Sequence, residues 1–314
     1  MFSEEQIAAL IIFPLALTGV VANWTVAFLI RKLPSLKNSF GRLTASQSIG
    51  DAIHCSIFAF AFSPMCFFGI DFLKTHSNFI GQSLLVAYDI STYSHFCISM
   101  NRFCSIVAPL KYDVIFSARN TRVFIFLSWA AAIIPSFYLY TYNDCKLVYY
   151  EDFWVFLFLT TPVCNNIVMY ADFLKYNSIV IAIVVIDVIT VSRVRSFKAG
   201  LSNTSTNSQV NRKAAEINFL KQACLQAFVF TCELTTYFII TPRVDPSFRW
   251  LRFSFTTVAW VLVHMLDGII TISFNQEFAQ IICRRIKISE FGEILRAPED
   301  DQGVPLSSHE PSRQ

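Results

Sequence analysis

The feature that most constrains this chain is a series of seven apolar stretches, each bounded by charged residues and each long enough to cross a membrane. A bilayer core of about 30 Å is crossed by roughly 20 residues of α-helix. Lipid offers backbone groups no hydrogen bonds, so such stretches fold as helices. The stretches are Ile7–Ile30, Leu43–Phe68, Phe79–Val107, Val123–Tyr142, Tyr176–Val191, Ile217–Ile240 and Phe253–Phe274. The sequence therefore predicts an all-α membrane protein, a seven-transmembrane helix bundle.

The composition agrees with a protein that faces lipid. Of the 314 residues, 54% are hydrophobic and 15% are charged, whereas a soluble domain has about 25% charged residues. A soluble protein this apolar would expose large patches that aggregate. The net charge of +3 is small and gives no reason to expect nucleic acid as a partner.

An eighth apolar run, Phe153–Met169, lies between the fourth and fifth stretches. It is short, contains Pro162 and two adjacent asparagines, and has acidic residues beside it. We interpret it as part of a long outer loop packed on the bundle. The alternative, an eighth span, would place both termini on the same side of the membrane.

The distribution of lysine and arginine predicts the orientation, because these residues are enriched in cytoplasmic loops. One set of loops carries Arg31, Lys32, Lys37, Arg42, Lys111, Arg119, Arg122, Arg193, Arg195, Lys198, Arg212, Lys213, Arg284, Arg285 and Lys287. In the opposite loops, basic residues are mixed with Asp and Glu. We therefore expect a multi-pass plasma-membrane protein with its N-terminus outside and its C-terminus in the cytoplasm.

The C-terminal region is predicted to contain two different elements. Phe278, Ile281 and Ile282 share one face of a helix, with Arg284 and Lys287 off that face. This pattern predicts a short amphipathic cytoplasmic helix at the lipid interface. The membrane domain is expected to span residues 1–288, and residues 289–314, which are polar, are expected to form a disordered cytoplasmic tail.

Four ionisable residues lie within the apolar stretches and stand out as functional candidates: Asp51, Arg102, Glu233 and Asp267. An ionisable group at mid-membrane costs a few kcal/mol on insertion scales, so it is by default a functional-site hypothesis. The alternative for each is a satisfied hydrogen bond between helices with a packing role alone.

The segment that contains Arg102 reads NRFCSIVAPLKY. It resembles the signature of rhodopsin-like G-protein-coupled receptors at the inner end of their third helix, which is Asp-Arg-Tyr followed by Pro-Leu, a basic residue and Tyr. The matching positions are Arg102, Pro109, Leu110, Lys111 and Tyr112. Asn101 and Phe103 replace the acid and the first tyrosine.

Other positions resemble a divergent branch of that family. Cys232-Glu233-Leu234-Thr235 replaces the Cys-Trp-x-Pro pattern of the sixth helix, and Asp267-Gly268 replaces Asn-Pro in the seventh. The Ser94-His95 pair, the Asn-Arg-Phe-Cys segment and the Tyr-Asn-Asp-Cys segment of the second outer loop resemble nematode serpentine chemoreceptors, most of all class X.

The resemblance implies a coupling site for a heterotrimeric G protein at Asn101, Arg102, Phe103 and Pro109. Because Asn101 is neutral, the usual ion pair of the inactive state is absent. We expect raised basal activity unless another acid, such as Glu216, substitutes. The alternative for Arg102 is a plain interfacial anchor.

The resemblance also implies a pocket for a small, partly apolar ligand. In the outer half of the bundle, Leu84, Tyr88 and Asp89 on the third stretch and Glu233 on the sixth are the expected ligand-binding residues. Leu84 occupies the position at which amine receptors place an Asp, so an amine ligand is not expected. Plain core packing is the alternative for each of these residues.

Asp51, Ser91 and Asp267 fall where the family builds its sodium pocket. Two carboxylates facing each other in a low dielectric do not both ionise without a cation between them. The sequence therefore predicts either a sodium ion at these residues or a protonated pair sharing a hydrogen bond, with His264 as a further partner. No other cofactor is expected.

Cys145 and Cys164 both lie in the long second outer loop, on the oxidising side of the membrane. A disulfide between them would fold this loop over the pocket. Cys66, at the outer end of the second stretch, is the competing partner, and sequence leaves the choice open.

The leading hypothesis is a G-protein-coupled chemosensory receptor, with lipid, a small extracellular ligand and a G protein as partners and with sensory cilia as an implied location. A peptide receptor of the same fold is the first alternative, and a transporter or channel using the buried acids is the second. No internal repeat or pair of broken helices supports the transporter. No nucleophile or metal-ligand constellation supports an enzyme.

Overall fold

The computed structural model describes residues 2–200, 207–275, 277–278 and 281. Within these residues the chain forms seven long helical segments, here called spans 1 to 7. Their bounds are Glu4–Leu29, Ser39–Phe68, Ser77–Val107, Ala118–Tyr142, Pro162–Gly200, Asn207–Arg243 and Arg249–Phe274. The predicted helix after span 7 and the tail lie almost entirely outside the described residues, as does the boundary at residue 288.

Spans 1 and 3 are single helices, α1 (Glu4–Leu29) and α5 (Ser77–Val107). The other spans each join α-helix to a π-helical segment. Span 2 is α2 (Ser39–Ile57), η2 (Phe58–Phe62) and α3 (Ser63–Phe68), and span 4 is α7 (Ala118–Ser136) and η3 (Phe137–Tyr142). Span 5 is α8 (Pro162–Ile167), η4 (Val168–Leu174) and α9 (Lys175–Gly200). Span 6 is α10 (Asn207–Leu234), η5 (Thr235–Ile240) and the 3-10 turn η6 (Thr241–Arg243); span 7 is α11 (Arg249–Phe253), η7 (Ser254–Val258) and α12 (Ala259–Phe274).

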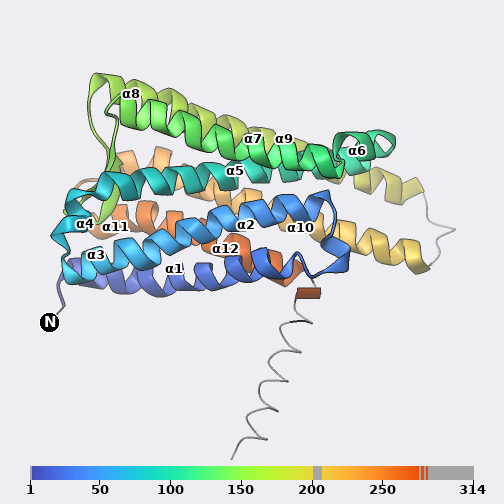
Figure 1. Cartoon of the computed structure of the whole chain (residues 1–314), viewed down its shortest axis with the longest axis horizontal. Helices are drawn as coiled ribbons and strands as arrows, with labels where there is room; N and C mark the ends of the chain where they lie inside the picture. The colour runs from blue at the N-terminus through green and yellow to red at the C-terminus, as the bar shows by residue number, and fades with distance from the viewer. Residues whose placement is uncertain (1, 201–206, 276, 279–280, 282–314) are drawn as a thin grey trace, which may run out of the picture.

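Six of these segments are long and apolar enough to cross a membrane, and the exception is α5. At 31 residues α5 is not short, so its polar composition sets it apart. It packs against α2, α7 and α9 and runs through the middle of the bundle (Figure 1). A helix surrounded by other helices meets protein rather than lipid, which is why it tolerates polar residues that hydrogen-bond inside the bundle.

Side-chain caps start several helices before the apolar stretches begin. Ser3 and Gln6 form a capping box at the start of α1, and the Asn38 side chain accepts a hydrogen bond from the backbone N–H of Gly41 in α2. The Ser117 side chain does the same at α7. Each cap satisfies an amide that the first turn leaves free, so the helices extend a few residues beyond the predicted limits.

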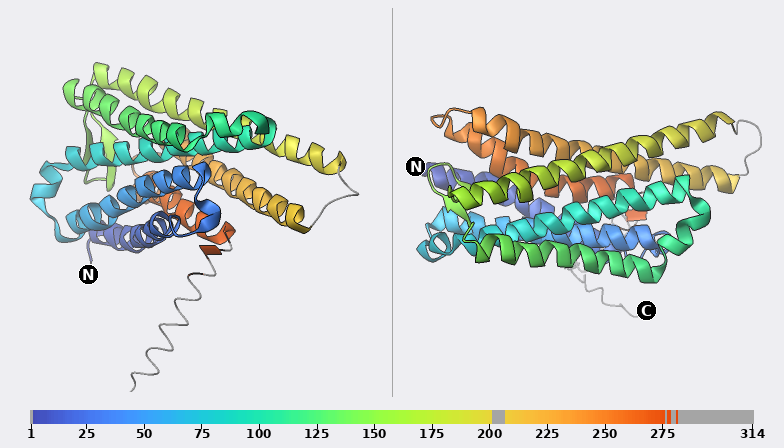
Figure 2. Two further views of the ribbon diagram at one scale, coloured as in Figure 1. Left: turned by 45° about the vertical axis from the view of Figure 1, so that its right-hand side comes forward. Right: turned by 90° about the horizontal axis from the view of Figure 1, so that it is seen from above.

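The bundle is elongated, and its two ends differ (Figure 1). One end carries the N-terminus and a β-hairpin and is called the hairpin end. The other carries α6 (Pro109–Ile115) and is called the α6 end. At the α6 end, α9 and α10 extend past the other helices (Figure 2).

The hairpin pairs β1 (Leu147–Tyr150) with β2 (Val155–Phe158), with Leu147 opposite Phe158. It lies directly on α5, because a Cβ added at Gly81 would be 2.3 Å from the carbonyl oxygen of Leu147. A disulfide joins Cys145 to Cys164, with their Cα atoms 4.8 Å apart. Cys66, the competing cysteine, donates a hydrogen bond to the Tyr149 hydroxyl.

The prediction for Phe153–Met169 was wrong in part. Val155–Phe158 is a strand packed on the bundle, as a folded loop would be, but residues from Pro162 onward belong to span 5. Thr161 caps this helix start by accepting the backbone N–H of Cys164, and proline is well suited to the first turn. The π-helical turn η4 interrupts the 3.6-residue period, which concealed the helix in the sequence.

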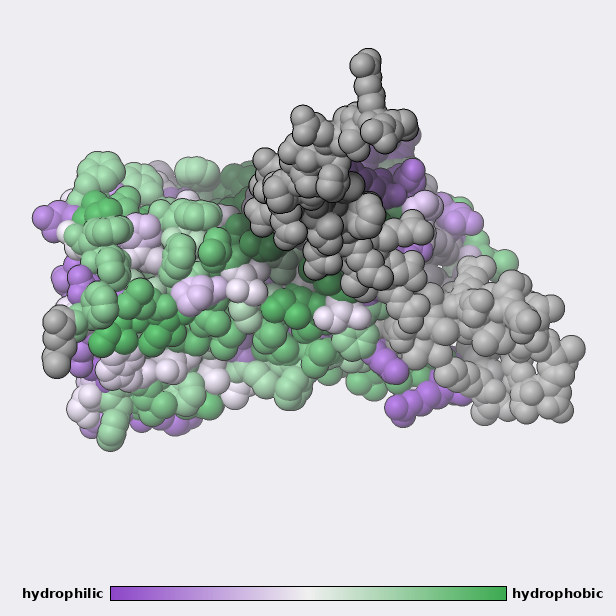
Figure 3. Space-filling view, turned by 90° about the horizontal axis from the view of Figure 1, so that it is seen from below, coloured by the Kyte–Doolittle hydropathy of each residue, from purple (hydrophilic) through white to green (hydrophobic). Residues whose placement is uncertain are grey.

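The surface follows the membrane pattern (Figure 3). Hydrophobic residues dominate the middle of the visible face, whereas the most hydrophilic residues gather mainly toward its ends. Large apolar side chains such as Phe28, Phe60 and Phe126 are more than 60% exposed. Exposure of this kind is what a lipid-facing surface requires, since lipid is as apolar as these side chains.

Candidate functional site

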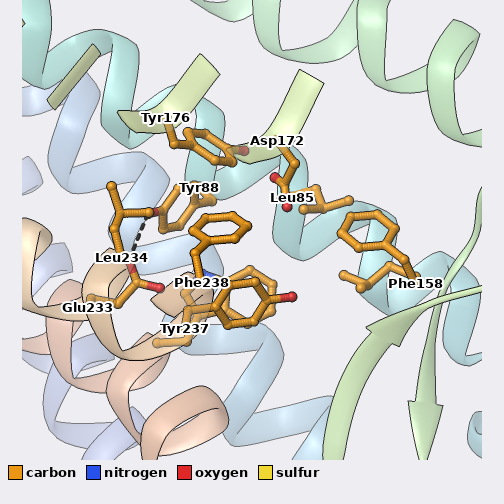
Figure 4. Close-up of a pocket in the computed structure, with 11 residues that line it drawn as sticks. Leu85, Tyr88, Phe158, Asp172, Tyr176, Glu233, Leu234, Tyr237 and Phe238 are labelled. Carbon is orange, nitrogen blue, oxygen red and sulfur yellow. Dashed lines mark hydrogen bonds between the residues drawn. The ribbon is translucent and has the colours of Figure 1, made fainter. Parts of the chain in front are cut away.

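A pocket of about 340 Å³ lies among spans 3, 5, 6 and 7 near the hairpin end (Figure 4). Its lining residues are Leu85, Tyr88, Leu147, Phe158, Asp172, Tyr176, Glu233, Leu234, Tyr237, Phe238 and Trp260. Only about 30 Å³ of this space is free for a water-sized molecule, well below the range for small-molecule sites, so a ligand enters only if side chains of the lining move apart. Leu147 from β1 and Phe158 from β2 are part of the lining, so the hairpin forms one wall of the pocket.

Two carboxylates face this pocket from different spans. Glu233 accepts a hydrogen bond from the Tyr88 hydroxyl at 2.9 Å, drawn as the dashed line in Figure 4. Asp172 comes from the π-helical turn η4 and is 3% exposed. Within the described residues no side chain donates a hydrogen bond to Asp172, so its carboxylate is open to a ligand.

Aromatic rings make up most of the remaining surface. The Tyr88 ring meets the Tyr176 ring edge-on at 4.7 Å and the Trp260 ring at 6.0 Å. Figure 4 shows Tyr237 and Phe238 beside them. Edge-on contacts hold such rings in defined positions. The pocket therefore has a largely apolar wall with two carboxylates that a ligand can contact.

The structure divides the predicted ligand residues into two groups. Tyr88 and Glu233 line the pocket together, whereas Leu84 is fully buried in the core and Asp89 is turned away. Asp89 instead forms an ion pair with Lys175, with Nζ 2.7 Å from Oδ1. A charge buried beside a cationic partner is compensated, so Asp89 fixes span 3 to span 5.

Sequence reasoning missed Asp172, the second acid of the pocket. The sequence places this residue in an outer loop, because the fifth apolar stretch begins at Tyr176. A π-helical turn adds one residue to the helical turn and gives no periodic signal of its own. The run of Asp172, Lys175 and Tyr176 beside an apolar stretch was the available sign of a polar helix face.

A second buried cluster lies deeper in the bundle, at the predicted sodium residues. The Ser91 hydroxyl donates to Asp51 Oδ1 at 2.6 Å, and His264 Nδ1 lies 2.7 Å from the same oxygen. Asp267 Oδ2 accepts from Gln47 Nε2 at 2.9 Å. The structure thus places the three predicted residues and His264, the expected further partner, in one cluster and adds Gln47 to it.

His264 is the member of this cluster that bears most on ion binding. Its imidazole directly contacts Asp51 and lies 3.8 Å, ring to ring, from His54. Both histidines are fully buried. An imidazole can balance a carboxylate by donating a hydrogen bond or by taking up a proton, so it competes with a cation for Asp51.

The predicted coupling residues lie at the α6 end. Pro109 is the exposed first residue of α6, and Phe103 is half-buried on α5. Asn101 donates a hydrogen bond to the Tyr112 hydroxyl at 3.2 Å. The amide that replaces the expected acid is therefore engaged by α6 and not by Arg102.

Arg102 is 6% exposed, and its guanidinium carbon lies 5.0 Å from the centre of the Phe40 ring. Within the described residues its three guanidinium nitrogens donate no hydrogen bond. The carboxylate whose charge acts on Arg102 belongs to Asp187 on α9. The side chain of Glu216, the acid expected to substitute for Asn101, lies outside the described residues.

Known proteins share both the sequence pattern and the fold. The family model of the serpentine seven-transmembrane G-protein-coupled chemoreceptor Srx matches residues 13–275. Serpentine receptor class X 45 of Caenorhabditis elegans is 34% identical, over 94% of this chain and 85% of that protein. Serpentine receptor class X-43 of the same organism is 26% identical, over 91% of this chain and 89% of its own length.

Among solved structures, squid rhodopsin superposes with a TM-score of 0.74 at 15% identity, over 99% of this chain and 92% of rhodopsin. This likeness shows the rhodopsin-like seven-helix fold. The relatives are receptors, and the chain is accordingly a multi-pass membrane receptor and not an enzyme. The match with the family model includes spans 2 to 7 and most of span 1, and the chain therefore belongs to the Srx family of serpentine G-protein-coupled chemoreceptors.

Proposed function

We propose that this receptor binds a small extracellular molecule in the pocket of Tyr88, Asp172 and Glu233 and then activates a heterotrimeric G protein at the α6 end. The observation that supports this most is the pairing of an apolar, ring-lined pocket with a carboxylate, Asp172, that has no hydrogen-bond donor among the described residues. The ligand we expect is small, largely apolar and equipped with a hydrogen-bond donor.

The size and cover of the pocket favour a small molecule over a peptide. The hairpin supplies Leu147 and Phe158 to the wall, and the Cys145–Cys164 disulfide ties this hairpin to the start of span 5. A peptide would need the hairpin to move aside. A permeation path is also disfavoured, because Asp51, Asp89 and Glu233 each have a protein partner.

The orientation belongs to the same proposal. The α6 end is cytoplasmic, since its connecting segments carry the basic residues, including Arg31, Arg42 and Arg119. The hairpin end, with the disulfide, is outside. A ligand from outside then reaches the pocket, and the exposed α6 and the buried Arg102 lie on the side of the G protein.

A cell-based assay tests this function. The receptor is displayed on heterologous cells, and second-messenger output is recorded against a panel of small volatile and soluble compounds, with Arg102→Glu in parallel. We expect an evoked response that Arg102→Glu abolishes at equal surface level. An ionic current that persists with G-protein blockade and in Arg102→Glu would overturn the proposal.

The pocket is tested in the same cells with Asp172→Asn and Glu233→Gln. Each change keeps the size of the side chain and removes the charge, and we expect the half-maximal ligand concentration to rise at least ten-fold, about 1.4 kcal/mol. Asp245→Asn, on the exposed connection between spans 6 and 7, is the matched control and should leave the response unchanged.

A further inference from the structure

A second cavity lies at the α6 end of the bundle, away from the ligand pocket. It is a groove of about 500 Å³ between the end of span 1, the connection to span 2, and spans 2 and 4. Its lining residues are Ile30, Arg31, Leu36, Lys37, Gly41, Arg42, Ala45, Ser46, Ile49, Arg122, Ile125 and Trp129. We call it the basic groove.

Four cations and no acid line the basic groove: Arg31, Lys37, Arg42 and Arg122. All four side chains are exposed, and none forms an ion pair with an acid among the described residues. They come from four places in the chain: Arg31 follows α1, Lys37 lies in the connection to α2, Arg42 is in the first turn of α2, and Arg122 is near the start of α7. Four like charges around one groove repel each other, so the groove is suited to an anion.

The short connection to α2 holds Lys37 at the mouth of the groove. The connection includes the 3-10 turn η1 (Pro34–Leu36), which lies against α2 at Gly41. A Cβ added at Gly41 would be 1.9 Å from the carbonyl oxygen of Leu36. The groove therefore has a defined, close-packed rim, which distinguishes it from a row of freely moving surface lysines.

Below the cations the lining becomes apolar, with Ala45 and Ile49 on α2 facing Ile125 and Trp129 on α7. The indole N–H of Trp129 donates to the Ser46 hydroxyl at 3.0 Å, and Ser46 in turn bonds Ser94 of α5 at 3.0 Å. With its polar edge satisfied inside the protein, Trp129 presents an apolar ring. This half of the groove suits a hydrocarbon chain.

We infer that the basic groove binds an anionic phospholipid of the cytoplasmic leaflet, with its headgroup among Arg31, Lys37, Arg42 and Arg122 and one acyl chain against Ile49, Ile125 and Trp129. Basic pockets on the cytoplasmic side of membrane helices are suited to anionic lipid headgroups. A free phosphate ion would leave the apolar half empty, and a neutral sterol would leave the four cations without a partner. The inference uses the orientation proposed above but not the ligand or the G protein.

Quenching of tryptophan fluorescence tests this site. The purified full-length receptor is placed in phosphatidylcholine nanodiscs in which a fixed fraction of lipid carries brominated acyl chains, on either phosphatidylserine or phosphatidylcholine. Bromine quenches nearby indoles, and Trp129 lines the groove. We expect brominated phosphatidylserine to quench more strongly than brominated phosphatidylcholine, and we expect Trp129→Phe to remove this excess.

Charge variants separate this site from a general attraction of the basic end. Arg42→Gln with Arg122→Gln should lower the preference for phosphatidylserine at least ten-fold, as expected for the loss of two cations near an anionic surface. Lys111→Gln with Arg119→Gln removes two exposed charges at the same end that do not line the groove and is the matched control, expected to keep the preference.

Three results would overturn the inference. These are equal quenching by the two brominated lipids, an equal loss of preference in the groove variant and the control, and displacement of the quenching lipid by an unbrominated sterol. Native mass spectrometry of the same samples gives the second readout. It should show phosphatidylserine retained by the wild type and by Trp129→Phe but not by the groove variant. The assay involves no agonist, so a failure of the proposed receptor function would not affect it.

Discussion

Asp187 on α9 is near enough for its charge to act on Arg102 on α5 without a hydrogen bond between them, and both side chains are buried, 2% and 6% exposed. The segment around Arg102 has lost the acid that normally precedes this arginine, because Asn101 stands there and bonds Tyr112. Asp187 provides negative charge from another span. The positive charge of Arg102 on span 3 is therefore compensated from span 5.

Removing this charge should activate the receptor without ligand. In Asp187→Asn, we expect basal second-messenger output to rise about five-fold or more, the effect of a typical coupling energy between two states, because Arg102 loses the negative charge that acts on it from α9. Asp113→Asn, on the exposed face of α6, is the control and should leave basal output unchanged. Unchanged output from Asp187→Asn at equal surface level would contradict this role.

Ligand recognition should depend on the hydroxyl of Tyr88 as well as on Glu233. Tyr88→Phe keeps the ring and removes the hydroxyl that donates a hydrogen bond to Glu233 at 2.9 Å. The buried Glu233 carboxylate then lacks this donor. We expect a shift of the dose–response curve of roughly ten-fold, since an unsatisfied buried group costs about 1–3 kcal/mol. The double change Tyr88→Phe with Glu233→Gln should shift it less than the sum of the singles. Strict additivity would show that the two residues act separately.

Sodium dependence should be decided by His264. Asp51, Ser91 and Asp267 remain the predicted ligands of a sodium ion, but His264 Nδ1 already lies 2.7 Å from Asp51. We expect the wild-type agonist affinity to be the same in sodium and in N-methylglucamine buffer. His264→Ala should make the affinity depend on sodium, because it frees the carboxylate. A sodium-dependent wild type would show that the ion and the imidazole bind together.

The disulfide between Cys145 and Cys164 should stabilise the folded receptor. Cys145→Ser and Cys164→Ser each break the same bond, so each should lower stability by the same amount, about 3 kcal/mol for a closed loop of this length. The measurement is thermal unfolding of the purified receptor, with Cys97→Ser, a free and partly buried thiol, as control. Unequal losses from the two serine variants would mean that Cys66 pairs with the cysteine that remains.

Low pH should weaken the ion pairs that Lys74 forms beside the hairpin. Lys74 lies 2.9 Å from Glu5 and 2.6 Å from Glu151, and so joins α1 to the turn of the hairpin. The hydrogen bond from Lys74 lowers the pKa of Glu151. Because the pKa of Glu151 is lower in the folded state than in the unfolded chain, its ionised form stabilises the folded state at pH values above the ordinary carboxyl pKa. This stabilisation is lost as the pH falls through the pKa of the folded state.

Hydrogen exchange of the hairpin amides measures this effect. We expect the amides of residues 147–158 to exchange faster below about pH 4.5, near the ordinary pKa of a glutamate. The increase should exceed the one that the pH dependence of the intrinsic exchange rate explains. Lys74→Met should already show the faster exchange at neutral pH and lose the acid effect. An acid effect that persists in Lys74→Met would assign the loosening to another group.

The sequence by itself determined that the chain crosses a membrane and, through the segment from Arg102 to Tyr112, to which receptor family it belongs. Apolar runs and their bounding charges depend on the solvent around each segment, and a short signature depends on neighbours along the chain. The apolar runs and the signature are both local properties, so they can be recognised from the sequence alone. The limits of spans 1 to 4 were likewise close. Spans 1, 2 and 4 begin at capping residues that lie next to the helices they start.

Only the tertiary structure decided which buried charges meet. Asp172 enters the pocket because a π-helical turn rotates it inward. His264 contacts Asp51 from a span distant in sequence, and the charge of Asp187 acts on Arg102 from another distant span. A membrane helix presents polar side chains on any face that packing covers, and packing depends on all seven spans together. Partners across the bundle are therefore set by the contacts among helices, which no single stretch of sequence contains.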